Sequence, residues 1–153
     1  MVTWSGKLEL TSPAFSDGGE IPRECGYKNG NKVPSLTVSG VPEGVESLAL
    51  IMDDPDAMEA VGKVWVHWVV WNLTWFADGK PHWDRPTKQG MTDFGEVGYG
   101  GPAPPDKRHT YVFKLYALDC KLDLPDKSTK ADVEKAMEGH IVDLATLTGT
   151  YAP

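Results

Sequence analysis

Two carboxylates and an imidazole stand beside the most apolar stretch of this chain. Asp54 and Asp56 flank Pro55 at the expected end of a strand, where the fixed φ of proline directs both side chains out at the rim of a sheet. His67 follows in the aromatic run "KVWVHWVVWN". Such a group could exchange protons, hold a metal or bind an anion. The plainer interpretation is a turn with capping aspartates and a hydrogen-bonded core histidine.

A second group of candidates lies later in the chain. His109 and Tyr111 are two residues apart in an expected strand, so an imidazole and a phenol project from the same face. Gly98, Gly100 and Gly101 precede them in "GYGGPAPPDKR" and allow backbone conformations that aim successive N–H groups at an anion. The loop lacks the Lys-Ser/Thr end of a phosphate loop and opens no helix, which disfavours P-loop nucleotide binding.

Strands must position these residues. Alternating apolar residues in "SLALIMDD" predict a strand that ends at Pro55, and "LTVSG" before the Pro42–Gly44 turn predicts a hairpin-like partner. The stretch "KVWVHWVVWNL" is apolar on both faces and indicates a central strand covered on both sides. Its alternation predicts that His67 shares a face with Trp65, Val69 and Trp71.

The last third of the chain mixes strand and helix patterns. "HTYVFKLYALD", His109 to Asp119, predicts a second buried strand. Thr129 and Asp132 resemble a capping box that opens a helix running up to Gly139, and "HIVDLATLTG" after it predicts a second short helix. Strands followed by terminal helices favour a mainly β fold, a sandwich of antiparallel sheets with short C-terminal helices.

Composition bounds the functions. The chain has 153 residues and a net charge of −7, which predicts one domain over residues 1–153 and disfavours nucleic acid as a partner. No stretch approaches the length of a transmembrane segment, and the N-terminus does not resemble a signal peptide, so we expect a cytoplasmic protein. Cys25 and Cys120 are then expected to be reduced thiols, with one disulfide as the alternative.

Several segments together resemble the phosphatidylethanolamine-binding protein family, in particular its prokaryotic branch. The resemblance runs in order along nearly the whole chain, from about Ser12 to Tyr151. Its motifs are "SPAF" from Ser12, "DDPDA" from Asp53, "VHWVVWN" from Val66, "GYGGPAPP" from Gly98, "HTYVFKLYALD" from His109 and "AMEGHI" from Ala136.

The resemblance implies two antiparallel β-sheets with short helices and a small pocket at one end for phosphate-like anions. It implies that the carboxylates keep the imidazole of His67 protonated or fix its tautomer, while the other ring nitrogen faces the ligand. Met58 and Ala103 depart from the family's usual proline and cysteine, which affects the expected rim of the pocket. Matched by motif, the pocket residues are Asp54, Asp56, His67, Gly101, Pro102, His109 and Tyr111.

The expected function is therefore a non-catalytic binding protein for phosphate or a phosphoryl headgroup, with no cofactor. The family resemblance leaves open a serine protease inhibitor or a kinase regulator, and it suggests a homodimer. A hydrolase or metal protein built on the Asp and His residues is disfavoured because the sequence has no GxSxG elbow, no HExxH helix and no cysteine cluster.

Overall fold

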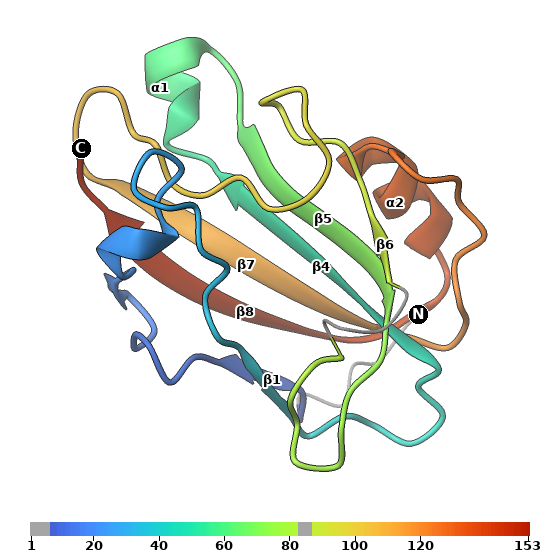
Figure 1. The fold of residues 1–153 in the computed structure, drawn as a ribbon. Coiled ribbons are helices and arrows are strands. Elements are labelled where there is room, and N and C mark those ends of the chain that lie inside the picture. The colour runs from blue at the N-terminus through green and yellow to red at the C-terminus, as the bar shows by residue number, and fades with distance from the viewer. Residues whose placement is uncertain (1–6, 83–86) are drawn as a thin grey trace.

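The computed structural model describes residues 7–82 and 87–153 and shows a β-rich fold with few helices (Figure 1). The helical elements of the described residues are the 3-10 helix η1 (Arg23–Cys25), α1 (Ala57–Val61) and α2 (Lys130–Met137). The strands are β1 (Glu9–Thr11), β2 (Gly19–Glu20), β3 (Thr37–Ser39), β4 (Ser47–Asp54), β5 (Trp65–Leu73), β6 (Lys88–Gln89), β7 (His109–Leu118) and β8 (Ile141–Tyr151).

A large sheet and a small one form the framework. Six strands pair in the order β2-β8-β7-β4-β5-β6, and β1 pairs with β3 in the second sheet. The long neighbours are antiparallel, whereas the two-residue strand β2 runs parallel to β8 at the edge. The mainly β fold with antiparallel sheets is confirmed, with this one parallel edge pairing as an addition.

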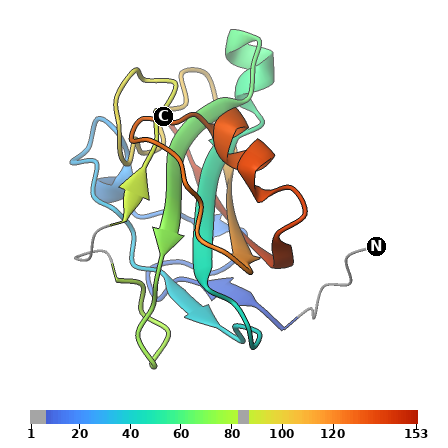
Figure 2. The same cartoon turned by 90° about the vertical axis from the view of Figure 1, so that its right-hand side faces the viewer.

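Both faces of the large sheet are covered. One face and the small sheet enclose the main core, to which Leu10, Val38, Leu50 and Phe113 contribute. The other face packs under α2 through Trp71 and its apolar neighbours. Figure 2 shows α2 on one side of the sheet and the blue N-terminal segments on the other. Strands β4 and β5 are therefore apolar on both faces because both faces are buried.

Three sequence predictions about these elements hold. The stretches predicted as buried strands form β4, β5 and β7. Thr129 caps α2 in a capping box, since its side chain accepts from the backbone N–H of Asp132 while the Asp132 carboxylate accepts from the backbone N–H of Thr129. Both cysteines are free thiols, as predicted; Cys25 is buried and Cys120 is half-buried. In the described part of the chain, no helix is long and apolar enough to cross a membrane.

The predicted second terminal helix is wrong. The segment after α2 forms the long strand β8, which pairs with β7 over its whole length. Ile141, Leu144 and Leu147 have helical spacing, but the residues that β8 buries alternate from Asp143 to Tyr151. Because one aspartate and one glycine lie on the buried face, the apolar residues of this segment do not alternate as they would in a typical strand. Pairing with β7 outweighs the helical spacing.

The predicted hairpin is also wrong. Strand β3 pairs with β1, with Leu10 opposite Val38, and not with β4. The connection from β3 to β4 crosses from the small sheet to the large one. The side chain of Val38 is thereby buried between the two sheets, where it contributes to the main core.

Candidate functional site

A bulge in β5 sets the position of His67. Met52 pairs with Trp68 and Asp53 pairs with Val66, so β5 has one extra residue there, which is His67. Trp68 packs in the core between the sheets, whereas Val69 and Trp71 pack under α2. The ring of His67 lies against Tyr111 on the side of the main core, so the prediction that it shares a face with Val69 and Trp71 is wrong.

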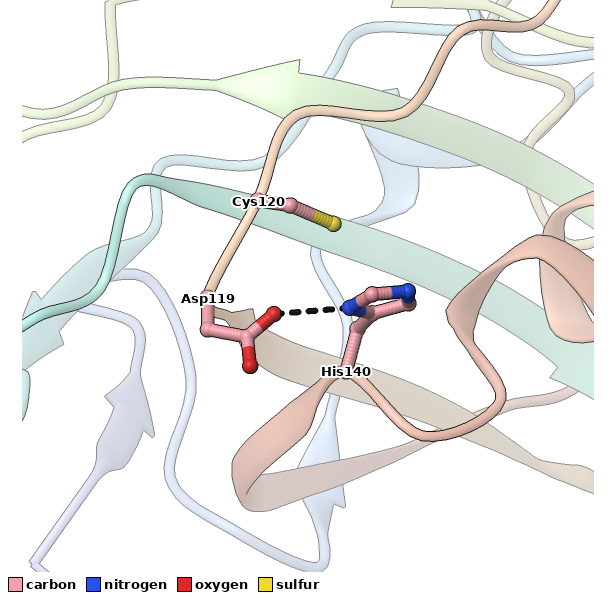
Figure 3. Close-up of side chains that lie close together, drawn as sticks. All are labelled: Asp119, Cys120 and His140. Atoms are coloured by element: carbon pink, nitrogen blue, oxygen red, sulfur yellow. Dashed lines mark hydrogen bonds and ion pairs between the residues drawn. The ribbon is translucent and has the colours of Figure 1, made fainter.

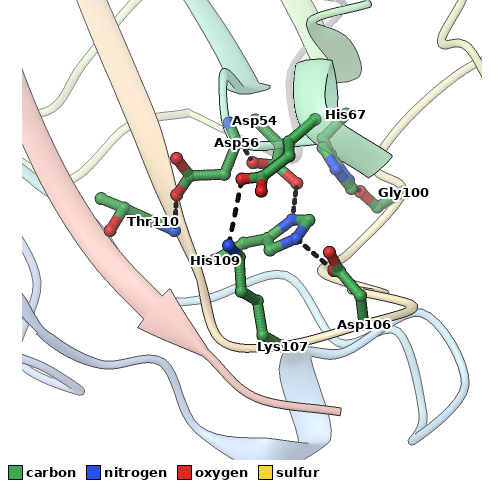
Figure 4. A network of polar contacts seen from close by, with 9 residues as sticks. Asp54, Asp56, His67, Gly100, Asp106, Lys107, His109 and Thr110 are labelled. Carbon is green, nitrogen blue, oxygen red and sulfur yellow. Dashed lines mark hydrogen bonds and ion pairs between the residues drawn. The ribbon is translucent and has the colours of Figure 1, made fainter. Parts of the chain in front are cut away.

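Aspartates clamp His109 at the start of β7 (Figure 4). Its Nδ1 lies 2.6 Å from Oδ2 of Asp54, the last residue of β4, and its Nε2 lies 2.7 Å from Oδ1 of Asp106. The imidazole is fully buried, the Asp54 carboxylate is 4% exposed and the Asp106 carboxylate is 40% exposed. Burial opposes the charge of the ring, but the hydrogen bonds and charges of the two carboxylates outweigh it and raise the pKa of His109. His109 is thus held as an imidazolium.

His67 is held differently. Its Nδ1 lies 2.6 Å from the carbonyl oxygen of Gly100, which can only accept, so Nδ1 carries the proton. Burial lowers the pKa of His67 and outweighs the opposing effects of the Gly100 carbonyl and the Asp54 charge. The expectation that an aspartate braces His67 is wrong in this respect: a backbone carbonyl fixes the ring, and Asp54 binds the neighbouring histidine.

Tyr111 lies close to both imidazoles. Its ring contacts the ring of His67 edge-on, with centroids 5.1 Å apart, and lies 6.3 Å from that of His109. The phenol is fully buried, and its oxygen makes no hydrogen bond of good geometry. Burial, followed by the charge of Asp54, raises the pKa of Tyr111, so the hydroxyl stays protonated. It is a buried donor close to the two histidines.

These elements enclose a pocket of about 220 Å³ at one end of the large sheet. Asp54, His67 and His109 are its polar lining. The apolar lining comes from α1, from Trp65 and from the loops before β7, with Phe94, Ala103 and Pro105. Lys107 holds α1 to the loop through Glu59, at 3.0 Å. Ala103, which departs from the family pattern, lies in this wall, whereas Met58 is exposed and outside it.

Four residues predicted for the pocket are not in its lining: Tyr111 lies against the ring of His67, and the other three lie beside the pocket. The Asp56 carboxylate accepts a hydrogen bond from the backbone N–H of Thr110 at 2.8 Å and joins the end of β4 to β7. The N–H of Gly101 donates to Asn31 at 2.7 Å. Pro102 lines a neighbouring cavity of about 310 Å³. These residues support the wall and the rim, and they are not in the lining.

Sequence reasoning missed Asp106, Phe94 and the carbonyl of Gly100. Asp106 precedes His109 by three residues, and a carboxylate just before a histidine that opens a strand was the available signal. Phe94 packs edge-on against His67, with centroids 5.3 Å apart. No sequence pattern identifies a single carbonyl such as that of Gly100, because every residue has one.

The hydrogen bonds of His109 limit what its imidazole can do chemically. His109 uses both ring nitrogens for aspartates, so it has none left to act as a base or a metal ligand without breaking a hydrogen bond. Among the described residues, the three side chains whose spacing suits a metal ion lie elsewhere, at Asp119, Cys120 and His140.

The fold and the pocket define a class: a small β-sandwich protein with a histidine-lined pocket at one end of its larger sheet. Residues 11–152 match the family model described as phosphatidylethanolamine-binding protein. A UPF0098 protein of Methanothermobacter thermautotrophicus is 44% identical over 151 residues, which cover 94% of this chain and 98% of that protein. The chain belongs to the phosphatidylethanolamine-binding protein family.

Solved structures agree with this assignment. A putative phosphatidylethanolamine-binding protein homologue from Chlamydia trachomatis has a TM-score of 0.86 at 39% identity, covering 96% of this chain and 98% of that one. YbcL of Escherichia coli, described as a member of the mammalian family, has a TM-score of 0.83 at 33% identity, covering 95% and 98%. A carboxypeptidase Y inhibitor, solved with its cognate proteinase, shares the fold alone, with a TM-score of 0.62 at 18% identity over 94% and 82% of the chains.

Proposed function

We propose that this protein binds a small anion, a phosphate or phosphoryl group, in the pocket at His67 and does so without catalysis. The observation that carries the proposal is the buried His67 imidazole in the lining of an otherwise mostly apolar cavity of about 220 Å³. Since Nδ1 is bound to Gly100, a ligand engages Nε2. A charge-assisted hydrogen bond in such a dry site contributes roughly 1.5–3 kcal/mol.

The protonation of His67 defines which form of the ligand fits. A neutral ring with its proton on Nδ1 presents a lone pair at Nε2, which repels a fully ionised oxygen. A proton must therefore accompany the anion, either on the ligand as an acidic monoester or on the ring as an imidazolium. The affinity for the anion is expected to fall as the pH rises, because both sources of the proton are lost.

Asp54 and Asp106 limit the strength of binding. Asp54 places a buried carboxylate in the pocket, and Asp106 at the rim occupies Nε2 of His109. An incoming anion competes with Asp106 for that nitrogen, and the net charge of −7 slows its approach. Because the surroundings of the pocket are negatively charged, we expect modest affinity for anions. We also expect a preference for ligands that carry a positively charged group, such as an ammonium, beside the phosphate.

Titration calorimetry with inorganic phosphate and with phosphoethanolamine tests the proposal. We expect binding that weakens from about pH 5.5 to about pH 8, on both sides of the ordinary histidine pKa. His67→Ala should weaken it at least tenfold, which corresponds to a lost hydrogen bond of about 1.4 kcal/mol. His140→Ala, at an exposed histidine outside the pocket, is the matched control. Affinity that is independent of pH and of His67 contradicts the proposal.

Serine protease inhibition is the alternative function, and kinase regulation is a further one. The carboxypeptidase Y inhibitor shares this fold, and the inhibitory role is a property of that protein. A panel of serine proteases assayed with the purified protein separates inhibition from anion binding, because His67→Ala alters only the latter if the two are independent. The homodimer stays a prediction that sedimentation can test.

A further inference from the structure

Asp119 and Cys120 follow the end of β7 and His140 precedes β8, whereas the pocket lies at the start of β7. Figure 3 shows that the three residues bring three different metal-ligating groups together. Their ligand atoms lie within 4.8 Å of one another. Nδ1 of His140 is 2.8 Å from Oδ1 of Asp119. Ligands around a tetrahedral zinc ion lie about 3.3–3.8 Å apart, given its usual bond lengths. Side-chain movements of about 1 Å therefore suffice to close the three around one ion.

Backbone hydrogen bonds hold the three residues in place. The N–H of Asp119 donates to the carbonyl of His140 at 3.1 Å, which joins the end of β7 to the start of β8. The carbonyl of Cys120 accepts from the Ser47 hydroxyl at 2.7 Å. The N–H of His140 donates to the carbonyl of Met137 at 2.9 Å, in the turn after α2. The ligands thus come from two segments that the fold fixes against each other, as a preorganised site requires.

The charge and the accessibility suit a cation. Asp119 and His140 are 51% and 46% exposed in their side chains, and Cys120 beside them is half-buried. Glu46 adds a second carboxylate near the thiol.

We propose that Asp119, Cys120 and His140 form a binding site for a divalent transition-metal ion of the zinc type. A thiolate, an imidazole and a carboxylate are the ligand set that such ions accept, and three protein ligands leave the fourth position open to water. A surface ion pair accounts for Asp119 and His140, and Cys120 packs against the apolar residues under α2, whereas a bound metal ion would engage the ligand atoms of all three residues at once.

Titration of the purified, reduced protein with Co²⁺ and then with Zn²⁺ tests the site. One equivalent of Co²⁺ should produce a thiolate-to-cobalt charge-transfer band and the visible bands of tetrahedral cobalt, and Zn²⁺ should remove both. Cys120→Ser should abolish the charge-transfer band, and His140→Gln should weaken the affinity for Zn²⁺ at least about tenfold, the least that loss of a metal-site group usually causes. Zn²⁺ should also protect Cys120 from alkylation.

Cys25→Ala is the matched control, since Cys25 is buried in the main core and far from the cluster in the sequence. It should leave the cobalt spectrum and the zinc affinity unchanged. Circular dichroism of each variant checks that the fold is kept. Because the side chain of His140 is about half exposed, His140→Gln should not disturb the fold. The proposal is overturned if no charge-transfer band forms, or if the affinity for Zn²⁺ is the same in wild type, Cys120→Ser and His140→Gln.

Discussion

Histidine–aspartate pairs lie near both ends of β7. The distance between the imidazole nitrogen and the carboxylate oxygen is similar in the two pairs, but the pairs differ in burial and in the groups around them. At the start of β7, His109 and Asp54 are 2.6 Å apart, and both side chains are buried. At its end, His140 and Asp119 are 2.8 Å apart, and both side chains are about half exposed. The first imidazole has a second aspartate on its other nitrogen, whereas the second has a thiol nearby.

The difference shows that the contact distance does not define the role of such a pair. In the buried pair, the low dielectric makes the ion pair strong and the loss of one partner costly. In the exposed pair, solvent screens the charges and the pair contributes little to stability. The buried pair therefore serves to hold the pocket wall, and the exposed pair leaves its atoms available to an external ion.

Removal of the aspartate from each pair gives the largest contrast. Asp54→Ala leaves a buried imidazolium with only the rim carboxylate of Asp106, and we expect a loss of about 3–5 kcal/mol in the free energy of unfolding. Asp119→Ala should cost less than about 1 kcal/mol. Urea denaturation monitored by tryptophan fluorescence measures both. Equal losses at the two ends would show that burial does not separate the pairs.

The pH dependence of stability sharpens the comparison within the pocket. Burial lowers the pKa of His67, so below the ordinary value of about 6.5 the unfolded chain takes up a proton that the folded protein resists. The stability of the wild type is therefore expected to fall as the pH drops through this range. His67→Gln lacks this contribution and should lose less stability between about pH 7.5 and about pH 5. His109 acts in the opposite direction but is present in both proteins.

Urea midpoints for wild type and His67→Gln at the two pH values give this result directly. A larger loss in the variant than in the wild type would contradict a neutral buried His67. His140→Gln serves as the control, because His140 is half exposed and lies at the other end of β7.

Asp106→Asn should have the smallest effect. Partial desolvation works against the charge of Asp106, yet the hydrogen bond with His109 lowers its pKa and keeps it ionised. The variant removes the negative group that competes with an anion for Nε2 of His109, so phosphate affinity should rise several-fold. Calorimetry measures the change, with Asp119→Asn as the control of equal charge. Weaker phosphate binding in Asp106→Asn would mean that Asp106 helps to hold the ligand.

Much of the fold follows from local sequence patterns. Strands β5 and β7 contain β-branched and aromatic residues in long runs, and the capping box of α2 has its two polar residues at the required spacing. Strand β8 could not be predicted in this way, because Asp143 and Gly149 interrupt its buried face and pairing with β7 determines its structure. Alternating Thr146, Thr148 and Thr150 were its remaining local signal.

The candidate site was less predictable than the fold. The motifs identify Asp54, His67 and His109, but the bulge that turns His67 toward the pocket arises from the register between β4 and β5. That register depends on contacts distant in the sequence. The partner of each imidazole depends on three-dimensional proximity. The sequence therefore could not predict that Asp54 binds His109 and not His67.

Nuclear magnetic resonance titration of the imidazole nitrogens, with and without phosphate, tests the central claim most directly. The pKa of His67 should start below the ordinary histidine value because of burial and should rise when phosphate is bound, since the anion favours the charged ring. At constant pH, the addition of phosphate should leave the nitrogen signals of His140, at the other end of β7, unchanged. A pKa of His67 that is the same in saturating phosphate as in its absence would contradict anion binding at this pocket.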